Sequence, residues 1–248
     1  MKKLVSFSAG LDSTTLLWQL EKQKEEEDEI IPLFVRYGQV WSYEELSSCR
    51  LAKLLGLDLV VLGGEQLVLG TRWEKERVGY IPMRNPYLMS VALNYAVEIG
   101  AEEIYFGLTG DCRYGDVTPE FLDRFNFMAQ EALAQLKVVP PILAPFSDSD
   151  TMDLVRIGQE LEVPYHYTFS CFRQPREGER ALCGLCPKCL DRWNIFRLLG
   201  HRKDPAYELV ADFNAEADFE KALSWSCYHA EHEDCDYVGC RCQCHKEG

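Results

Sequence analysis

The chain of 248 residues has no long hydrophobic run. No apolar stretch approaches the roughly 20 residues that a helix needs to cross a bilayer. The two lysines near the start are followed by neither a long apolar segment nor a small-residue cleavage site, which a secretory signal would require. The sequence therefore predicts a soluble, cytoplasmic protein with no membrane partner.

Positive charge is also scarce. Lysine and arginine total 26, against 40 aspartates and glutamates, which gives a formal net charge of -14. Such a charge repels nucleic acids and anionic membranes at long range, so nucleic-acid binding would require a local basic patch. A small molecule or another protein is the expected partner, and nucleic acid is not.

Two common nucleotide-binding motifs are absent. The chain contains no G-x-x-x-x-G-K-[ST] motif of P-loop NTPases and no G-x-G-x-x-G motif of dinucleotide-binding folds. Any phosphate site must therefore be built in another way.

A phosphate-sized site is predicted instead between residues 4 and 17. An apolar run, interpreted as a buried strand, breaks at residues 8–13 and resumes with the spacing of a helix. Ser8, Gly10 and Ser13 offer hydroxyl and backbone N–H groups around one point, and the positive end of the new helix faces it. A plain turn of small residues at the end of a strand is the alternative interpretation.

Apolar runs alternate with helix-period segments through residue 161. This alternation predicts an α/β fold with a doubly wound, parallel five-stranded sheet of Rossmann-like type. In such sheets ligands bind beyond the carboxyl ends of strands where the strand order reverses, so residues 8–13 and 109–116 should meet there. The strands are expected near residues 3–8, 30–36, 58–63, 103–108 and 142–146, and the helices near 12–24, 42–56, 86–99, 119–136 and 149–161.

The cysteines indicate metal binding, since nine of the eleven follow residue 170. The cytoplasm keeps thiols reduced, so a disulfide framework is not expected. Two overlapping C-x-x-C steps and one earlier cysteine predict a closed tetrahedral zinc site that fixes the loop of residues 170–182 beside the active centre. An iron–sulfur cluster and free thiols are the alternatives. The four ligands are Cys171, Cys183, Cys186 and Cys189.

A second cluster of potential ligands lies at the end of the chain, where eight cysteines and histidines fall within nineteen residues. This density predicts a second zinc site, with a disordered, weakly metal-binding terminus as the alternative. The favoured ligands are Cys227, Cys235, Cys240 and Cys242, and the other choices are Cys244, His229, His232 and His245. The chain is thus predicted to have an α/β domain over residues 1–165, a zinc-binding segment and helix over 166–200, and a Cys/His-rich appendage over 201–248.

The loop of residues 8–13 resembles the SGGxDS signature of N-type ATP pyrophosphatases, with Ala9 in the place of the second glycine. If this position needs a positive φ, alanine costs roughly 1 kcal/mol there. With further segments, residues 3–197 resemble the 7-cyano-7-deazaguanine synthase family, the QueC-like ligases of deazapurine biosynthesis. These segments are RYGQ at 36–39, YIPMRN at 80–85, EEIYFG at 102–107, TPEFLDRFN at 118–126, VRIGQELEVPYHYTFSC at 155–171 and CGLCPKCLDRWNIF at 183–196.

The resemblance implies an ATP-dependent ligase that uses Mg2+ and forms a homodimer. ATP would adenylate the carboxylate of 7-carboxy-7-deazaguanine and release pyrophosphate. Ammonia would then form an amide, and a second adenylation would dehydrate the amide to the nitrile. The loop N–H groups and Mg2+ would stabilise the charge that develops on the departing pyrophosphate.

The resemblance also assigns site residues. Arg84 is expected to pair with the substrate carboxylate and Asn85 to bind a purine edge, although a helix start with an exposed arginine is the alternative. Asp12 would position Mg2+ or cap the helix. The implied catalytic residues are Asp12, Ser13 and Arg84. The implied nucleotide-binding residues are Ser8, Ala9, Gly10, Leu11, Asp12, Ser13 and Thr14, and the substrate-binding ones are Tyr37, Gln39, Arg84, Asn85, Thr109 and Asp116.

Three positions depart from the family pattern. Arg36 stands where the family has aspartate, residues 115–118 lack an arginine of the family, and Thr151 stands where the family has lysine. A charge-assisted contact contributes about 1.5–3 kcal/mol, so the loss of a cation near the triphosphate matters. Arg36 or Arg113 is expected to replace it.

These departures and the cysteine-rich tail leave other functions open. QueC-like proteins associated with antiviral defence are thought to join a deazaguanine carboxylate to a protein amine, and the tail would then recognise a protein acceptor. A tRNA thiolase would use the same ATP loop, with Cys112 as its sulfur carrier. A non-catalytic zinc-binding interaction module would retain a decayed loop.

Overall fold

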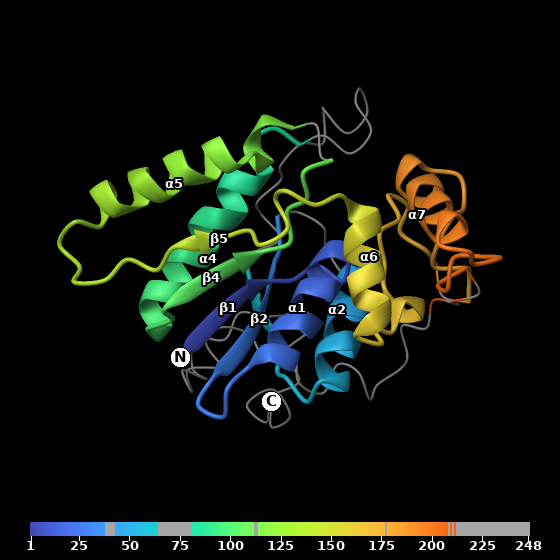
Figure 1. The fold of residues 1–248 in the computed structure, drawn as a ribbon, viewed down its shortest axis with the longest axis horizontal. Coiled ribbons are helices and arrows are strands. Elements are labelled where there is room, and N and C mark those ends of the chain that lie inside the picture. The colour runs from blue at the N-terminus through green and yellow to red at the C-terminus, as the bar shows by residue number, and fades with distance from the viewer. Residues whose placement is uncertain are drawn as a thin grey trace, which may run out of the picture.

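A computed structural model describes residues 1–37, 43–63, 81–111, 114–176, 178–207, 209 and 211 of the chain. At its centre lies a sheet in which the described residues form five strands in the order β3-β2-β1-β4-β5 (Figure 1). All neighbouring strands in this order run parallel, so the predicted doubly wound sheet is confirmed. The strands are β1 (Lys2–Ser6), β2 (Glu29–Val35), β3 (Val60–Leu62), β4 (Glu103–Phe106) and β5 (Ile142–Leu143).

The strand order reverses at β1. The chain builds outward from β1 through β2 to β3, and then returns to the other side of β1 with β4 and β5. Leu4 of β1 is paired with Ile31 of β2 on one side and with Ile104 of β4 on the other. Ligands of such sheets bind beyond the carboxyl ends of the two strands that flank the reversal. These ends are followed by the residues 7–10 and 107–111.

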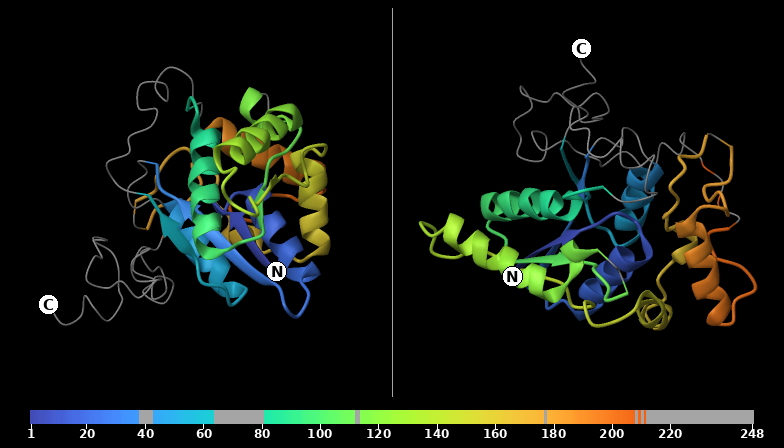
Figure 2. Two further views of the ribbon diagram at one scale, coloured as in Figure 1. Left: turned by 90° about the vertical axis from the view of Figure 1, so that its left-hand side faces the viewer. Right: turned by 90° about the horizontal axis from the view of Figure 1, so that it is seen from above.

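Alternate residues of the strands face two separate hydrophobic layers, because successive side chains of a strand point to opposite sides. Leu4 packs with α4 and α5, whereas Val5 packs with α1, α2 and α6. The two groups of helices therefore cover opposite faces of the sheet (Figure 2). The helices are α1 (Leu11–Gln23), α2 (Tyr43–Leu54), α4 (Arg84–Ile99), α5 (Pro119–Ala132), α6 (Thr151–Glu160) and α7 (Pro187–Leu198), with the short 3-10 helices η1 (Gly115–Val117) and η2 (Tyr165–Tyr167).

Capping residues determine where two of these helices begin. The Thr118 hydroxyl accepts a hydrogen bond from the Phe121 N–H at 3.2 Å, and Pro119 occupies the first helical position. The Asp150 carboxylate accepts one from the Asp153 N–H at 2.7 Å. No helix in the described part of the chain is both long and apolar enough to span a membrane.

The segment that contains α7 packs beside α6 (Figure 1). Phe196 of α7 is fully buried and makes an edge contact with Tyr165, with ring centroids 5.5 Å apart. Arg192, also buried, donates to both oxygens of Asp204 at 2.7 and 2.9 Å. These contacts attach the predicted zinc-binding segment to the α/β domain. The proposed boundaries at residues 165 and 200 stay predictions, and most of the appendage lies outside the described residues.

Ala9 has a left-handed backbone with φ 55°, and its side chain is fully buried. Only glycine adopts this region without steric cost, because the Cβ of other residues comes close to the following carbonyl. The expectation that alanine is strained at this position therefore holds.

Candidate functional site

The loop between β1 and α1 gathers small polar groups at the carboxyl edge of the sheet. The Ser8 N–H donates to the Ser13 hydroxyl at 3.3 Å, and the two hydroxyl oxygens lie 3.4 Å apart. Gly10 is the N-cap of α1, so the positive end of this helix borders the loop. The loop thus has the hydroxyl and backbone groups that bind a phosphate.

The end of β4 lies directly against this loop. A Cβ added at Gly107 would stand 2.9 Å from the backbone nitrogen of Ser13, which is closer than real contacts of this kind. Glycine is therefore required where β4 passes the first turn of α1. The position belongs to the EEIYFG segment, so the sequence pattern reflects a packing requirement.

Thr109, Asp111 and Thr151 form a hydrogen-bonded group beside the loop. The Thr151 N–H and hydroxyl each donate to the Asp111 carboxylate at 3.3 Å, and the Thr109 and Thr151 hydroxyls are 3.4 Å apart. Residues 8–13 and 109–111 therefore lie at one edge, as predicted. Thr151 opens α6 within this group but brings no positive charge.

The carboxyl group of Asp12, in the loop of residues 8–13, has a raised pKa. Burial is the main cause that raises its pKa, and nearby Asp111 adds to the rise, while Lys188, Arg192 and Thr151 oppose it. The net effect is a pKa raised from 3.8 to about 6. Its Oδ1 atom is buried and has no hydrogen-bond partner among the described residues. A buried acceptor of this kind fits Mg2+, which prefers carboxylate oxygens and phosphate-bound sites.

Arg36 is not available to a triphosphate. Its Nε and Nη2 atoms donate to Glu45 at 2.8 and 2.7 Å, and both side chains are buried. A two-point pair in the interior fixes the guanidinium beside α2. The expectation that Arg36 replaces the family lysine is therefore wrong, because sequence spacing does not reveal that Glu45 faces it. Arg113, the other candidate, lies outside the described residues.

Arg84 and Asn85 begin α4, so this helix starts two residues before the expected range of 86–99. Met83, the residue before them, has a left-handed backbone with φ 61°, a second strained position at this edge. Two effects act on the pKa of Glu44. Burial, the larger effect, raises this pKa, and the nearby Arg84 lowers it, which leaves a net value of about 7. Sequence reasoning gave Glu44 no role, since only the fold places it near Arg84.

The other predicted substrate-side residues are less closely grouped. Tyr37 lies two residues beyond the end of β2, and Thr109 lies in the group with Thr151. Asp116 is half-buried in η1, and its side chain makes no hydrogen bond with another described residue. Gln39 lies outside the described residues, as does Cys112, the sulfur carrier of the thiolase alternative.

The first four cysteines converge, and their sulfur atoms all lie within 4.8 Å of one another. The Cys171–Cys186 and Cys183–Cys189 sulfur pairs are each 3.9 Å apart. A tetrahedral site with Zn–S bonds of about 2.3 Å separates its sulfurs by roughly 3.8 Å. The spacing thus leaves room for one ion rather than for a cluster of several irons, which favours zinc.

Backbone N–H donors favour the thiolate form in part of the cysteine group. A bond with Cys189 is the largest cause that lowers the pKa of the Cys171 thiol, and the same bond raises the pKa of Cys189. The Cys183 and Arg173 N–H groups lower the pKa of Cys171 further. The Cys183 sulfur accepts from the Cys186 N–H at 3.3 Å. Such donors stabilise thiolates, the form that binds zinc. The second predicted set, Cys227, Cys235, Cys240 and Cys242, lies outside the described residues.

The cysteine segment is bonded to the loop of residues 8–13. The Phe169 N–H donates to the Ala9 carbonyl at 2.9 Å. On either side of Phe169, the Thr168 and Ser170 hydroxyls accept from Arg192 at 2.9 and 3.3 Å. The segment leading to Cys171 is thereby positioned against the loop, and the role of zinc in fixing residues 170–182 stays a prediction.

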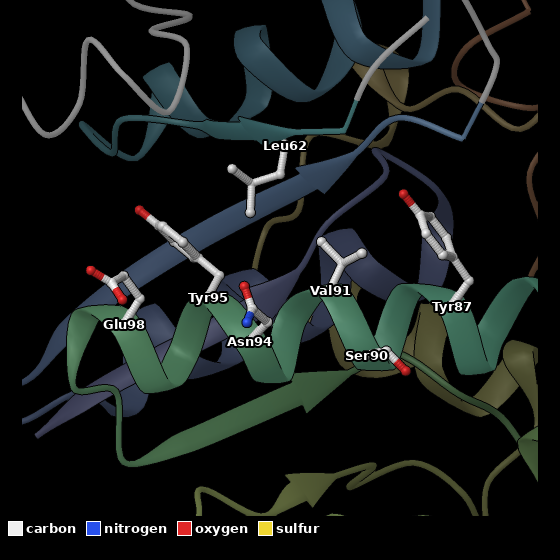
Figure 3. Close-up of a pocket in the computed structure, with 7 residues that line it drawn as sticks. All are labelled: Leu62, Tyr87, Ser90, Val91, Asn94, Tyr95 and Glu98. Carbon is white, nitrogen blue, oxygen red and sulfur yellow. The ribbon is translucent and has the colours of Figure 1, made fainter. Parts of the chain in front are cut away.

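A hollow of about 470 Å³ lies elsewhere, between α4 and the end of β3 (Figure 3). None of residues 8–13 contributes to it, so it is separate from the loop. Its lining residues are Leu62, Tyr87, Ser90, Val91, Asn94, Tyr95 and Glu98.

Comparisons with known proteins agree with these observations. A family model described as "Queuosine biosynthesis protein QueC" matches residues 2–200. The 7-cyano-7-deazaguanine synthase of Archaeoglobus fulgidus is 34% identical over 223 residues, covering 83% of this chain and 89% of that protein. The enzyme of the same name from Oceanobacillus iheyensis is 34% identical over 220 residues, covering 80% and 95%.

Similarity to solved structures is weaker. The U34-tRNA thiolase NcsA from Methanococcus maripaludis with its [4Fe-4S] cluster is 15% identical, with a TM-score of 0.46 over 71% of this chain and 61% of that one. This similarity does not bear on the activity. With its parallel sheet, its loop at the strand reversal and its four converging cysteines, the chain belongs to the QueC family.

Proposed function

We propose that this chain is an ATP-dependent carbon–nitrogen ligase that converts 7-carboxy-7-deazaguanine into 7-cyano-7-deazaguanine with ammonia as the nitrogen donor. The observation that carries the proposal is the loop of residues 8–13 in a QueC-family chain, with the unpartnered Oδ1 of Asp12 buried beside it. The names of the relatives supply the substrate class.

Chemistry begins with a carboxylate, which is a poor electrophile. Its oxygen attacks the α-phosphorus of ATP, the bond to the β-phosphate oxygen breaks, and pyrophosphate leaves. Ser8, Ser13 and the N-terminus of α1 stabilise the charge on the leaving pyrophosphate. Asp12 would hold Mg2+, which supplies further charge neutralisation at the phosphates.

Arg84 orients the acid in the first step, since its guanidinium can pair with a carboxylate. Ammonia then attacks the acyl carbon, AMP leaves and a proton is lost, which yields the amide. In a second round the amide oxygen attacks the α-phosphorus of another ATP, pyrophosphate leaves and the nitrogen loses one proton. Loss of AMP and of the second proton from the nitrogen then gives the nitrile.

The experiment is to supply the purified protein with ATP, Mg2+, the carboxylated base and ammonia. Mass spectrometry should detect the nitrile, and AMP and pyrophosphate should accumulate only when the base is present. Asp12→Asn should lose this activity, whereas Asp123→Asn, a change of the same kind at an exposed site on α5, should keep it. No AMP from the wild-type protein would refute the ligase assignment and favour a non-catalytic zinc-binding module.

A second candidate is a ligase that joins the deazaguanine carboxylate to a protein amine, as proposed for antiviral defence. One observation favours it: the family match ends at residue 200, and 48 residues with five cysteines follow. The same assay distinguishes the two. Amide alone, or no product until a protein acceptor is added, would support this candidate.

The remaining proposals concern metal and assembly. The converging cysteines fit one zinc ion, and the tail cysteines would hold a second. We expect a homodimer, which light scattering after size-exclusion chromatography would test.

A further inference from the structure

Neither residue 151 nor residue 36 supplies a positive charge that faces the loop of residues 8–13. Thr151 stands at the family's lysine position and is bonded to Asp111, while Arg36 is held by Glu45. Two carboxylates, Asp12 and Asp111, lie at this edge instead. A polyphosphate bound there would meet net negative charge unless another element supplies a cation.

Helix α7 places a lysine toward this edge. Lys188 is the second residue of the helix, and Arg192 lies one turn later on the same face. That face is turned toward the loop, because Arg192 contacts Thr168 and Ser170. Between these two residues, Phe169 bonds the Ala9 carbonyl at 2.9 Å.

Electrostatics gives the same placement. Among charged groups, Lys188 has the largest influence on the Asp12 carboxyl, ahead of Asp111 and Arg192. Lys188 is itself exposed, so its ammonium group is free to move toward an incoming anion. A long, exposed lysine beside a buried carboxylate suits a site that is filled only when nucleotide and Mg2+ arrive.

We propose that Lys188 binds a phosphate oxygen of ATP held by residues 8–13 and so replaces the lysine that this chain lacks at Thr151. The inference rests on the proposed function, because it assumes that ATP binds at this loop. Lys188 lies between Cys186 and Cys189, so the cysteine site would hold the lysine in place as well as stabilising the loop.

The test compares ATP binding by calorimetry and steady-state kinetics in the wild-type protein, Lys188→Ala, Lys188→Gln and Lys188→Arg. We expect the alanine and glutamine variants to raise the Kd and KM for ATP about tenfold to hundredfold. The KM for the base should stay within about twofold, and Lys188→Arg should retain most of the affinity. Arg202→Ala, which removes an exposed cation from the same segment, should change neither value.

A rescue variant makes the test specific. Adding Thr151→Lys to Lys188→Ala should restore ATP affinity, because either position would then supply the cation. Metal content and thermal unfolding, measured on each variant, should match the wild-type protein. An unchanged Kd and KM for ATP in Lys188→Ala would overturn the inference while leaving the ligase assignment intact. A wild-type protein that binds no ATP would overturn both.

Discussion

The Phe169 N–H donates a hydrogen bond to the carbonyl of Ala9 at 2.9 Å, and this bond joins the cysteine segment to the phosphate loop. Ala9 is the strained residue of that loop, and Phe169 lies two residues before the first cysteine ligand. The cysteine group that could hold a metal and the proposed nucleotide loop are therefore joined directly, and this predicts an effect of metal removal on nucleotide binding.

Loss of the metal should weaken nucleotide binding as well as stability. Cys186→Ser removes one of four thiolates, so we expect zinc content to fall, the melting temperature to drop and the affinity for ATP to decrease. Elemental analysis, thermal unfolding and calorimetry would measure the three effects. Cys49→Ser, at a buried cysteine in the layer between the sheet and α2, should keep the metal and the ATP affinity.

Zinc stoichiometry separates the two predicted metal sites. Near one zinc per chain is expected from the first cysteine group alone, and near two if the tail also binds metal. Removal of residues 212–248 should then lower the value from about two to about one. Much less than one zinc in the full chain would contradict both sites.

The left-handed backbone of Ala9 predicts a small change in stability for one substitution and a large loss for another. Ala9→Gly should change the free energy of unfolding by less than about 1 kcal/mol, because relief of strain is offset by a lost buried methyl group and a more flexible unfolded chain. Ala9→Val should be strongly destabilising, since a β-branched residue resists positive φ and the position has no free space. Denaturant unfolding would measure both, and a tolerated valine would show that the loop is not strained.

Much of the fold follows from the sequence because its signals are local. The alternation of apolar runs and helical periods predicts all five strands, and the helices expected near residues 119–136 and 149–161 correspond to α5 and α6. The predicted strand over residues 142–146 is shorter in the structure, where β5 ends at Leu143. Apolar residues beyond that point, such as Phe146, are buried without extending the strand, which composition does not reveal.

The site was less predictable where it depends on contacts between distant elements. The Ser8–Ser13 loop and the C-x-x-C spacing are contiguous, so their roles could be expected from the sequence. The pairing of Arg36 with Glu45 depends on how α2 packs on β2, and the placement of Lys188 near Asp12 depends on how α7 packs beside α6. Sequence spacing contains neither piece of information.

The raised pKa of Asp12 predicts that the free energy of unfolding is lower above pH 6 than below pH 4. The folded protein keeps the proton up to about pH 6, whereas the unfolded chain releases it near 3.8, so stability falls as pH rises through this window. Without nucleotide or added Mg2+, Asp12→Asn should therefore be more stable than wild type at pH 7.5, by at most about 3 kcal/mol. The stability difference between Asp12→Asn and the wild-type protein should be smaller at pH 5 than at pH 7.5. Thermal unfolding at both values would check this, and an advantage that is equal at the two pH values would contradict it.

The Arg36–Glu45 pair should contribute to stability and not to ATP binding. Either Arg36→Met or Glu45→Gln breaks a buried two-point ion pair by changing one member only, so each should cost about 3–5 kcal/mol. The double variant Arg36→Met with Glu45→Leu should recover much of that loss, because it leaves no uncompensated buried charge. In every variant that folds, the KM for ATP should stay near the wild-type value. A large rise confined to the Arg36 variants would instead place this guanidinium at the triphosphate, in conflict with its two-point contact to Glu45.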